Sequence, residues 1–191
     1  MTVARETKEV KRPGLLAEIG IARVAAVSAL LIVGFALQTT VLTRATLLGV
    51  IPQVLLVVIL SLAFTDGERV GVVAGFFGGL LIDLRLEDPS ALMGLTALIY
   101  TIVGYGVGSV RRFTTSESVW MPVFVVAIAS AIVEASYAGL SIILGQQWVS
   151  LAFTAKAAGL VVLYNTLLTP FIFPVVRRVA ERFRPERVYR W

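Results

Sequence analysis

The chain has 191 residues, of which 58% are hydrophobic and only 15% are charged, and its mean hydropathy is +0.89. Soluble domains are about 45–50% apolar and about 25% charged, so this composition is that of a membrane protein. The chain contains no cysteine and no histidine, which excludes disulfides, thiolate nucleophiles and imidazole chemistry. The net charge of +5 does not require a nucleic-acid partner, because basic residues outside the bilayer orient membrane proteins.

We expect one transmembrane domain, residues 15–178, between a cytoplasmic N-terminal tail (1–14) and a basic cytoplasmic C-terminal tail (179–191). A helix needs about 20 apolar residues to cross the hydrocarbon. In the second of the long apolar runs, Pro52 falls near the start, where a missing N–H does least harm. Five runs are long and largely uncharged, and each predicts a crossing helix: 24–43, 45–65, 89–110, 119–145 and 157–176.

A sixth apolar segment, 70–82, holds only 13 residues, about 20 Å of helix against a hydrocarbon core of about 30 Å. It is either a short crossing helix or a re-entrant hairpin. If it crosses, all basic residues except Arg44, Arg85 and Lys156 lie on the side of the N-terminus, 14 of the 17. If it does not, the division is 8 against 9. The positive-inside rule therefore favours six transmembrane helices with both termini in the cytoplasm.

Glycines give the short segment a distinctive face. Gly71, Gly75 and Gly79 are four residues apart, so on a helix they form one smooth stripe. Such stripes allow close backbone approach between transmembrane helices, whereas each interior glycine costs a helix about 1 kcal/mol. Gly104 and Gly108 form a second smooth patch, and the two patches can pack on each other. We expect the stripe to pack within the chain; the alternative is that part of it receives the helix of a partner.

The only carboxylate deep in a predicted crossing helix is Glu134. A charge at the bilayer centre costs on the order of 3 kcal/mol, so Glu134 should face the bundle interior and be paired or protonated. It lies at a depth similar to that of Asn165, which is adjacent to Tyr164. We therefore predict a hydrogen bond from Glu134 within the bundle, to the last helix. The alternative is a proton or ligand site.

The basic ends predict contact with the membrane surface. Six arginines lie between Arg177 and Arg190, and basic residues beside a crossing helix attract anionic lipids by about 1 kcal/mol each. Docking of a cytoplasmic filament or synthase is the alternative. Trp120, Trp148 and Tyr189 are predicted interfacial anchors.

An ordered set of residues runs through the centre of the sequence. It comprises Pro52, Leu55, Leu56, Ala63, Phe64, Gly67, Gly71, Gly75, Phe76, Gly79, Leu80, Asp83, Leu84, Gly94, Ala97, Leu98, Gly104, Tyr105 and Gly108. This order, the chain length and the basic ends resemble the MreD family of rod shape-determining membrane proteins. Gln53 departs from the pattern, which has an acidic residue after the proline, and the departure weakens any role for that position.

The resemblance implies an all-α membrane fold of six transmembrane helices, similar to the substrate-binding (S) subunits of energy-coupling-factor transporters. It also implies a non-catalytic scaffold of the bacterial cell-elongation complex in the inner membrane, supporting peptidoglycan synthesis and cell shape. The implied partners are MreC, a single-span protein, and further MreB and the peptidoglycan polymerase–transpeptidase pair. No catalytic residue, cofactor or metal is expected.

The family pattern also bears on Asp83. The carboxylate is either solvated beside Arg85, Glu87 and Asp88, or it accepts hydrogen bonds from a neighbouring loop and fixes the turn at 86–91. The main rival function is a small-molecule-binding subunit of an energy-coupling-factor-type transporter, which needs a polar cavity near the membrane midplane. The polar candidates are few: Glu134, Asn165, Tyr137, Tyr164 and Gln38. A membrane enzyme is a third possibility, for which the sequence holds no suitable set of residues.

Overall fold

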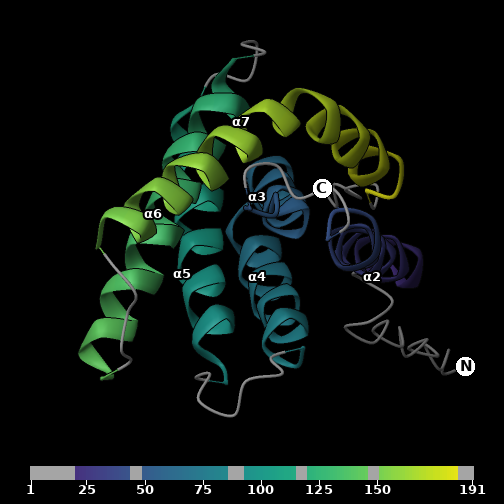
Figure 1. Cartoon of the computed structure of the whole chain (residues 1–191). Helices are drawn as coiled ribbons and strands as arrows, with labels where there is room; N and C mark the ends of the chain where they lie inside the picture. Colours follow the sequence, from purple (N-terminus) through teal and green to yellow (C-terminus); the bar gives the residue numbers. More distant parts are fainter. Residues whose placement is uncertain (1–19, 44–48, 86–92, 115–119, 146–150, 185–191) are drawn as a thin grey trace, which may run out of the picture.

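The computed structural model describes residues 20–43, 49–85, 93–114, 120–145 and 151–184. Within these ranges every regular element is helical, which confirms the predicted all-α class (Figure 1). A π-helical turn, η1 (Leu37–Val41), continues α2, and a 3₁₀ turn, η2 (Arg111–Phe113), follows α5. The six α-helices of the described ranges are α2 (Ile21–Ala36), α3 (Val54–Asp66), α4 (Glu68–Asp83), α5 (Leu95–Val110), α6 (Met121–Ile143) and α7 (Leu151–Arg182).

Several predicted features fall outside the described residues. They are the N-terminal tail 1–14, the turn at 86–91 with Glu87 and Asp88, Arg44, the anchors Trp148 and Tyr189, and the arginines Arg187 and Arg190.

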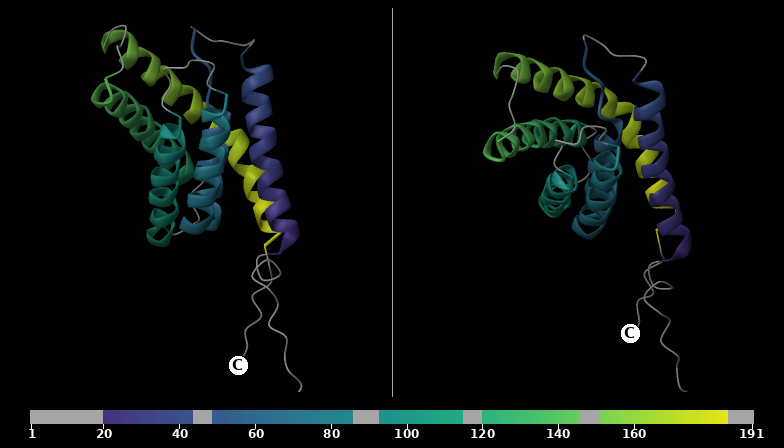
Figure 2. Two further views of the ribbon diagram at one scale, coloured as in Figure 1. Left: turned by 90° about the horizontal axis from the view of Figure 1, so that it is seen from below. Right: turned by 60° about the horizontal axis from the view of Figure 1, so that its bottom comes forward.

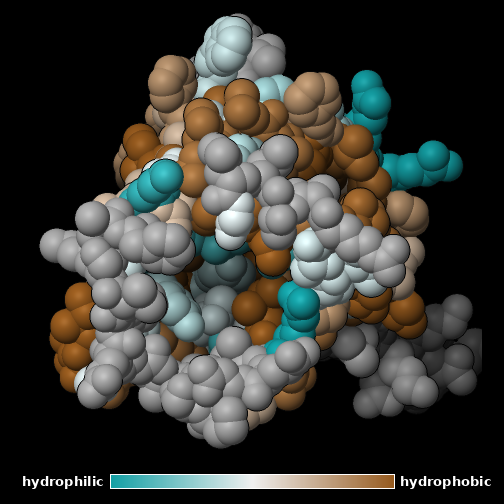
Figure 3. Space-filling model, in the orientation of Figure 1, coloured by the Kyte–Doolittle hydropathy of each residue, from teal (hydrophilic) through white to brown (hydrophobic). Residues whose placement is uncertain are grey.

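Three helical stretches in the described ranges are long and apolar enough to cross a membrane: Ile21–Val41, Met121–Ile143 and Thr154–Arg182. The helices α3, α4 and α5 are shorter, with 13, 16 and 16 residues, or about 20–24 Å at 1.5 Å per residue. Large apolar side chains such as Phe77, Ile102 and Phe124 point outward. Among the coloured residues of the face in Figure 3, hydrophobic ones predominate, as expected for helices that face lipid.

The centre of the bundle is α3. Every residue from Val54 to Thr65 is buried, and α3 contacts each of the other five α-helices described. A helix that is apolar on every side is stable in a bundle only when neighbours or lipid cover every side. The structure meets the expectation of a helix over 45–65 only in part, because α3 begins at Val54. Pro52 lies before the helix, and its ring disfavours helical backbone at Ile51.

The short glycine-rich segment forms the continuous helix α4, which is antiparallel to α5. Gly67 separates α3 from α4 with a φ of +93°, a value that glycine adopts at little cost. Figure 1 shows α4 and α5 side by side along their lengths. The helix expected over 89–110 begins at Leu95 in the structure.

The last helix is longer than the expected 157–176. It runs from Leu151 to Arg182 through Pro170 and Pro174, beyond the domain boundary expected at 178. Figure 2 shows that α7 changes direction along its length, and that its C-terminal part lies beside α2. Proline inside a helix removes a hydrogen bond and bends the axis, so the two prolines account for the bend.

Candidate functional site

The glycines of α4 and α5 bring the two backbones into direct contact. A Cβ atom added at Gly71, Gly75, Gly79, Gly104 or Gly108 would fall less than 3.0 Å from backbone atoms of the opposite helix, so only glycine permits this approach. The contacts follow an antiparallel register along both helices: Gly71 on Gly104, Gly75 on Tyr100, Gly79 on Ala97, and Gly108 on Glu68. We call this interface the glycine seam.

The seam fills the glycine stripe from within the chain. The backbone of α5 occupies the space beside Gly71, Gly75 and Gly79, so the helix of a partner cannot lie in the same place. Gly78, on the neighbouring face of α4, is directed at the Ile59 side chain of α3. The short helix is thereby fixed on two sides, against α5 and against the central helix.

Asp83 caps the start of α5 from the end of α4. Its carboxylate accepts the backbone N–H groups of Thr96 (3.3 Å) and Ala97 (3.0 Å), and the residue is only 2% exposed. The N-cap residue of α5 is Gly94, which has no side chain to do this. Of the two interpretations of Asp83, solvation is therefore wrong. The donors lie in the first turn of α5, where N–H groups lack helical partners and favour negative charge.

A second set of polar side chains satisfies the start of α3. The N–H of Gln53 donates to Oδ1 of Asn165 in α7 (3.1 Å), and the N–H of Leu55 donates to Oε1 of Gln38 in η1 (3.0 Å). A helix beginning at membrane depth leaves N–H groups that water cannot satisfy. Two amide side chains from flanking helices supply the missing acceptors.

Gln53 is the hub of this polar network. Its side-chain Nε2 donates to Oε1 of Glu134 in α6 at 2.7 Å, and Tyr100 Oη donates to its Oε1 at 3.4 Å. Asn165 Nδ2 in turn donates to Oγ of Ser130 at 3.1 Å. Asn165 and Ser130 are completely buried, and Tyr100 is 4% exposed. The start of α3 is thus joined to α5, α6 and α7.

The predicted hydrogen bond from Glu134 to the last helix is wrong in its partner. Glu134 bonds to Gln53, which lies at the start of α3, and Asn165 of α7 belongs to the same network through the Gln53 backbone. Tyr164 and Tyr137 are half-buried in α7 and α6.

Sequence reasoning missed three members of this network, Gln53, Tyr100 and Ser130. Gln53 departs from the family pattern, which hides its role, although a polar residue directly before twelve buried residues needs a partner. Ser130 is four residues before Glu134 and so shares its helix face. No sequence pattern points to Tyr100, because its place in the network depends on where α5 packs against α3.

Ion pairs gather the helix ends at one side of the bundle. Asp66, whose side chain is 1% exposed, lies 3.1 Å from Arg23 of α2 and 3.2 Å from Arg184, just past α7. Glu68 at the start of α4 pairs with Arg112 after α5. Arg23, Arg112 and Arg184, three residues predicted to share the cytoplasmic side, therefore lie at the same end.

A bundle with an apolar outer surface, a backbone-to-backbone seam and an internal polar network between helices defines an integral membrane protein. Among the described residues, no group of three His, Cys, Asp or Glu side chains could hold a metal ion. The chain belongs to the MreD family, since the family's sequence model, rod shape-determining protein MreD, matches residues 21–179. No curated protein and no solved structure matches it.

Proposed function

We propose that this protein is a non-catalytic scaffold of the cell-elongation machinery in the inner membrane. In this proposal it binds MreC and supports peptidoglycan synthesis and cell shape, together with MreB and the polymerase–transpeptidase pair. Membership of a rod shape-determining family supports the role.

The proposal includes six membrane crossings with both termini in the cytoplasm. Two observations support it. The basic residues Arg23, Arg112 and Arg184 cluster at one end of the bundle, and that end is cytoplasmic by the positive-inside rule. Asp83 and the start of α5 lie at the far end of the antiparallel α4–α5 pair, so α4 leads away from the basic end and α5 returns to it.

The observation that carries the scaffold proposal is the glycine seam. Backbone contact along both helices allows little relative movement, because a shift brings backbone atoms into collision. The seam makes α4, α5 and α3 a rigid unit on which a single-span partner can be held. Because α5 fills the glycine stripe, we place MreC on the lipid-facing surface of the bundle rather than in the seam.

The rival function, a small-molecule-binding transporter subunit, needs polar groups that are free to meet a ligand. The amide side chains of Gln38, Gln53 and Asn165 each make a hydrogen bond with another part of the chain. Because these bonds hold the helices of the chain together, they favour a structural role for this interior.

Affinity purification of the tagged full-length protein in mild detergent tests the proposal. We expect a single-span protein with a large extracytoplasmic domain to co-purify with this protein. The same single-span protein should not co-purify with an unrelated multi-span protein that carries the same tag. Recovery of an ATPase module in its place contradicts the scaffold and supports the transporter subunit.

A further inference from the structure

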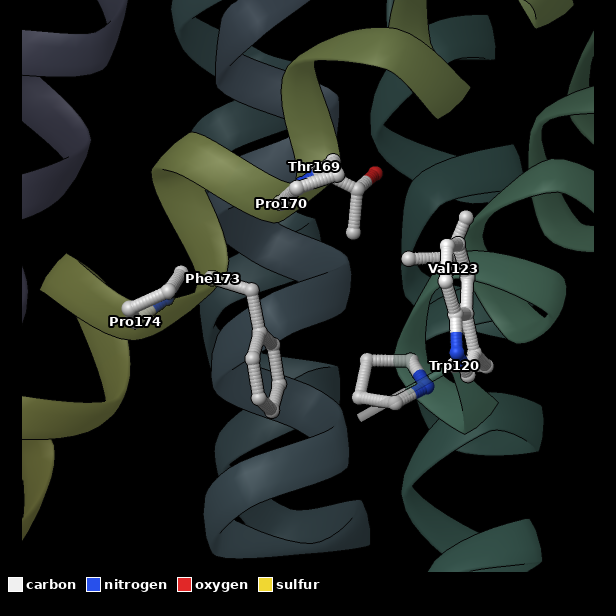
Figure 4. Close-up of a pocket in the computed structure, with 7 residues that line it drawn as sticks. Trp120, Val123, Thr169, Pro170, Phe173 and Pro174 are labelled. Carbon is white, nitrogen blue, oxygen red and sulfur yellow. The ribbon is translucent and has the colours of Figure 1, made fainter. Parts of the chain in front are cut away.

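An apolar pocket opens where α6 begins beside the bend of α7. Its volume is about 130 Å³. Figure 4 shows residues that line it from both helices. Its walls are Trp120, Pro122 and Val123 at the start of α6, and Pro170, Phe173 and Pro174 of α7.

The polar side chain in the wall of the pocket, Thr169, is already hydrogen-bonded within the chain. Thr169 also lines the pocket, and its Oγ1 donates to the Asn165 carbonyl at 2.7 Å. Phe173 packs edge-to-face on Phe64 of the central helix, with ring centroids 5.9 Å apart. The pocket is therefore an apolar space with a wall anchored to the core, suited to a hydrocarbon chain.

Trp120 places the mouth of the pocket at a membrane interface. This side chain is 68% exposed, and tryptophan is enriched at headgroup level because its ring is apolar and its N–H is polar. The pocket thus lies at the depth where the first part of a lipid acyl chain meets its headgroup.

A basic side chain, Arg178, lies one helical turn beyond the pocket on α7. Pro170, Pro174 and Arg178 are spaced by four, so Arg178 continues the face of α7 that lines the pocket. Arg178 is exposed and makes no ion pair with any residue that the structure describes. Its neighbour Arg177 is engaged with Glu181, at 2.8 Å between Nε and Oε1.

We propose that the pocket and Arg178 together form a binding site for one anionic phospholipid. An acyl chain occupies the pocket, the Trp120 indole lies at the headgroup, and the Arg178 guanidinium binds the phosphate, for which its planar donors are well shaped. A headgroup with net negative charge is favoured over a zwitterionic one because arginines predominate at this end of α7.

Native mass spectrometry of the full-length protein in mild detergent tests the charge part of the site. The protein is loaded with equal amounts of phosphatidylglycerol and phosphatidylcholine of identical acyl chains. We expect one phosphatidylglycerol to be retained in preference. Arg178→Gln should weaken its retention about fivefold, the effect of one basic residue on an anionic lipid. Arg177→Gln, which removes the same charge from an engaged side chain, should change it little.

Filling the pocket tests the acyl-chain part. Val123→Phe places an aromatic ring inside the pocket and should also lower phosphatidylglycerol retention. Ile128 is 62% exposed on the outer face of α6, so Ile128→Phe should leave the retention unchanged. In the wild type, inorganic phosphate should not displace the lipid. Equal retention of the two lipids overturns the proposal, as does an equal effect of the two arginine variants. Displacement by phosphate points to a free anion instead, and so also overturns it. If Val123→Phe does not fold, phosphatidylglycerol with shortened chains takes its place, and undiminished retention of that lipid contradicts the pocket.

Discussion

The Glu134 carboxylate accepts a hydrogen bond from the Gln53 side-chain amide, with 2.7 Å between Oε1 and Nε2. This contact joins the middle of α6 to the first turn of the central helix, 81 residues away in sequence. A carboxylate at membrane depth needs such a donor. The network around Gln53 therefore fixes the start of α3 against α6.

Removing one partner of this pair should cost more than removing both. Gln53→Leu leaves the Glu134 carboxylate without its donor and should destabilise the protein by about 1.5–3 kcal/mol, whereas replacing both partners with apolar groups can be nearly neutral. Thermal unfolding in detergent should therefore show Gln53→Leu/Glu134→Leu unfolding at a higher temperature than Gln53→Leu alone. A double variant less stable than the single one contradicts the pairing.

Asp83 should matter as a cap for α5. Asp83→Ala removes the acceptor for two N–H groups and should cost about 1–2 kcal/mol, the usual loss for an N-cap. Asp83→Asn keeps one acceptor oxygen and should cost less. Arg85→Ala, two residues further along the chain, serves as the control. Equal unfolding temperatures for Asp83→Ala and the control would count against the capping role.

The buried carboxylate of Asp66 should depend on both of its arginines. Changing Arg23 and Arg184 together to glutamine leaves a carboxylate buried without a cation, a change that typically costs about 3–5 kcal/mol. Adding Asp66→Asn to that double variant should restore part of the loss, because the uncompensated charge is removed. We expect the denaturation midpoint of the triple variant to be higher than that of the double variant. A lower midpoint would show that loss of the ion pairs with Asp66 does not explain the destabilisation.

The proposed topology can be tested because the natural chain has no cysteine. Arg85→Cys and Thr114→Cys place single thiols after α4 and after α5. A membrane-impermeant maleimide should label the first in intact cells, and the second only after the membrane is permeabilised. Labelling of both from the same side would mean that α5 does not cross.

Much of the fold was predictable because the bilayer imposes simple rules. Apolar length predicted most of the helices, and the four-residue spacing of Gly71, Gly75 and Gly79 predicted a face for close packing. These signals are local along the chain or depend on charge alone.

The polar network was not predictable in the same way, because its contacts are decided by which helix ends meet. Gln53 bonds to residues 81 and 112 positions away, and no spacing within one helix reports such pairs. The late start of α3 has the same origin. Pro52 blocks the helix upstream, and the amides of Gln38 and Asn165 then replace the helical acceptors that are lost.

The most direct test of the central claim compares one added methyl group inside the glycine seam with one outside it. Gly75→Ala places a Cβ against the Tyr100 backbone, whereas Gly106→Ala, also in the α4–α5 pair, meets open space. The measurement is the amount of MreC that co-purifies per molecule of membrane-inserted protein. We predict a clear loss for Gly75→Ala and none for Gly106→Ala. If both variants recovered as much MreC as the wild type, the claim that the glycine seam forms the rigid unit that holds the partner would be contradicted.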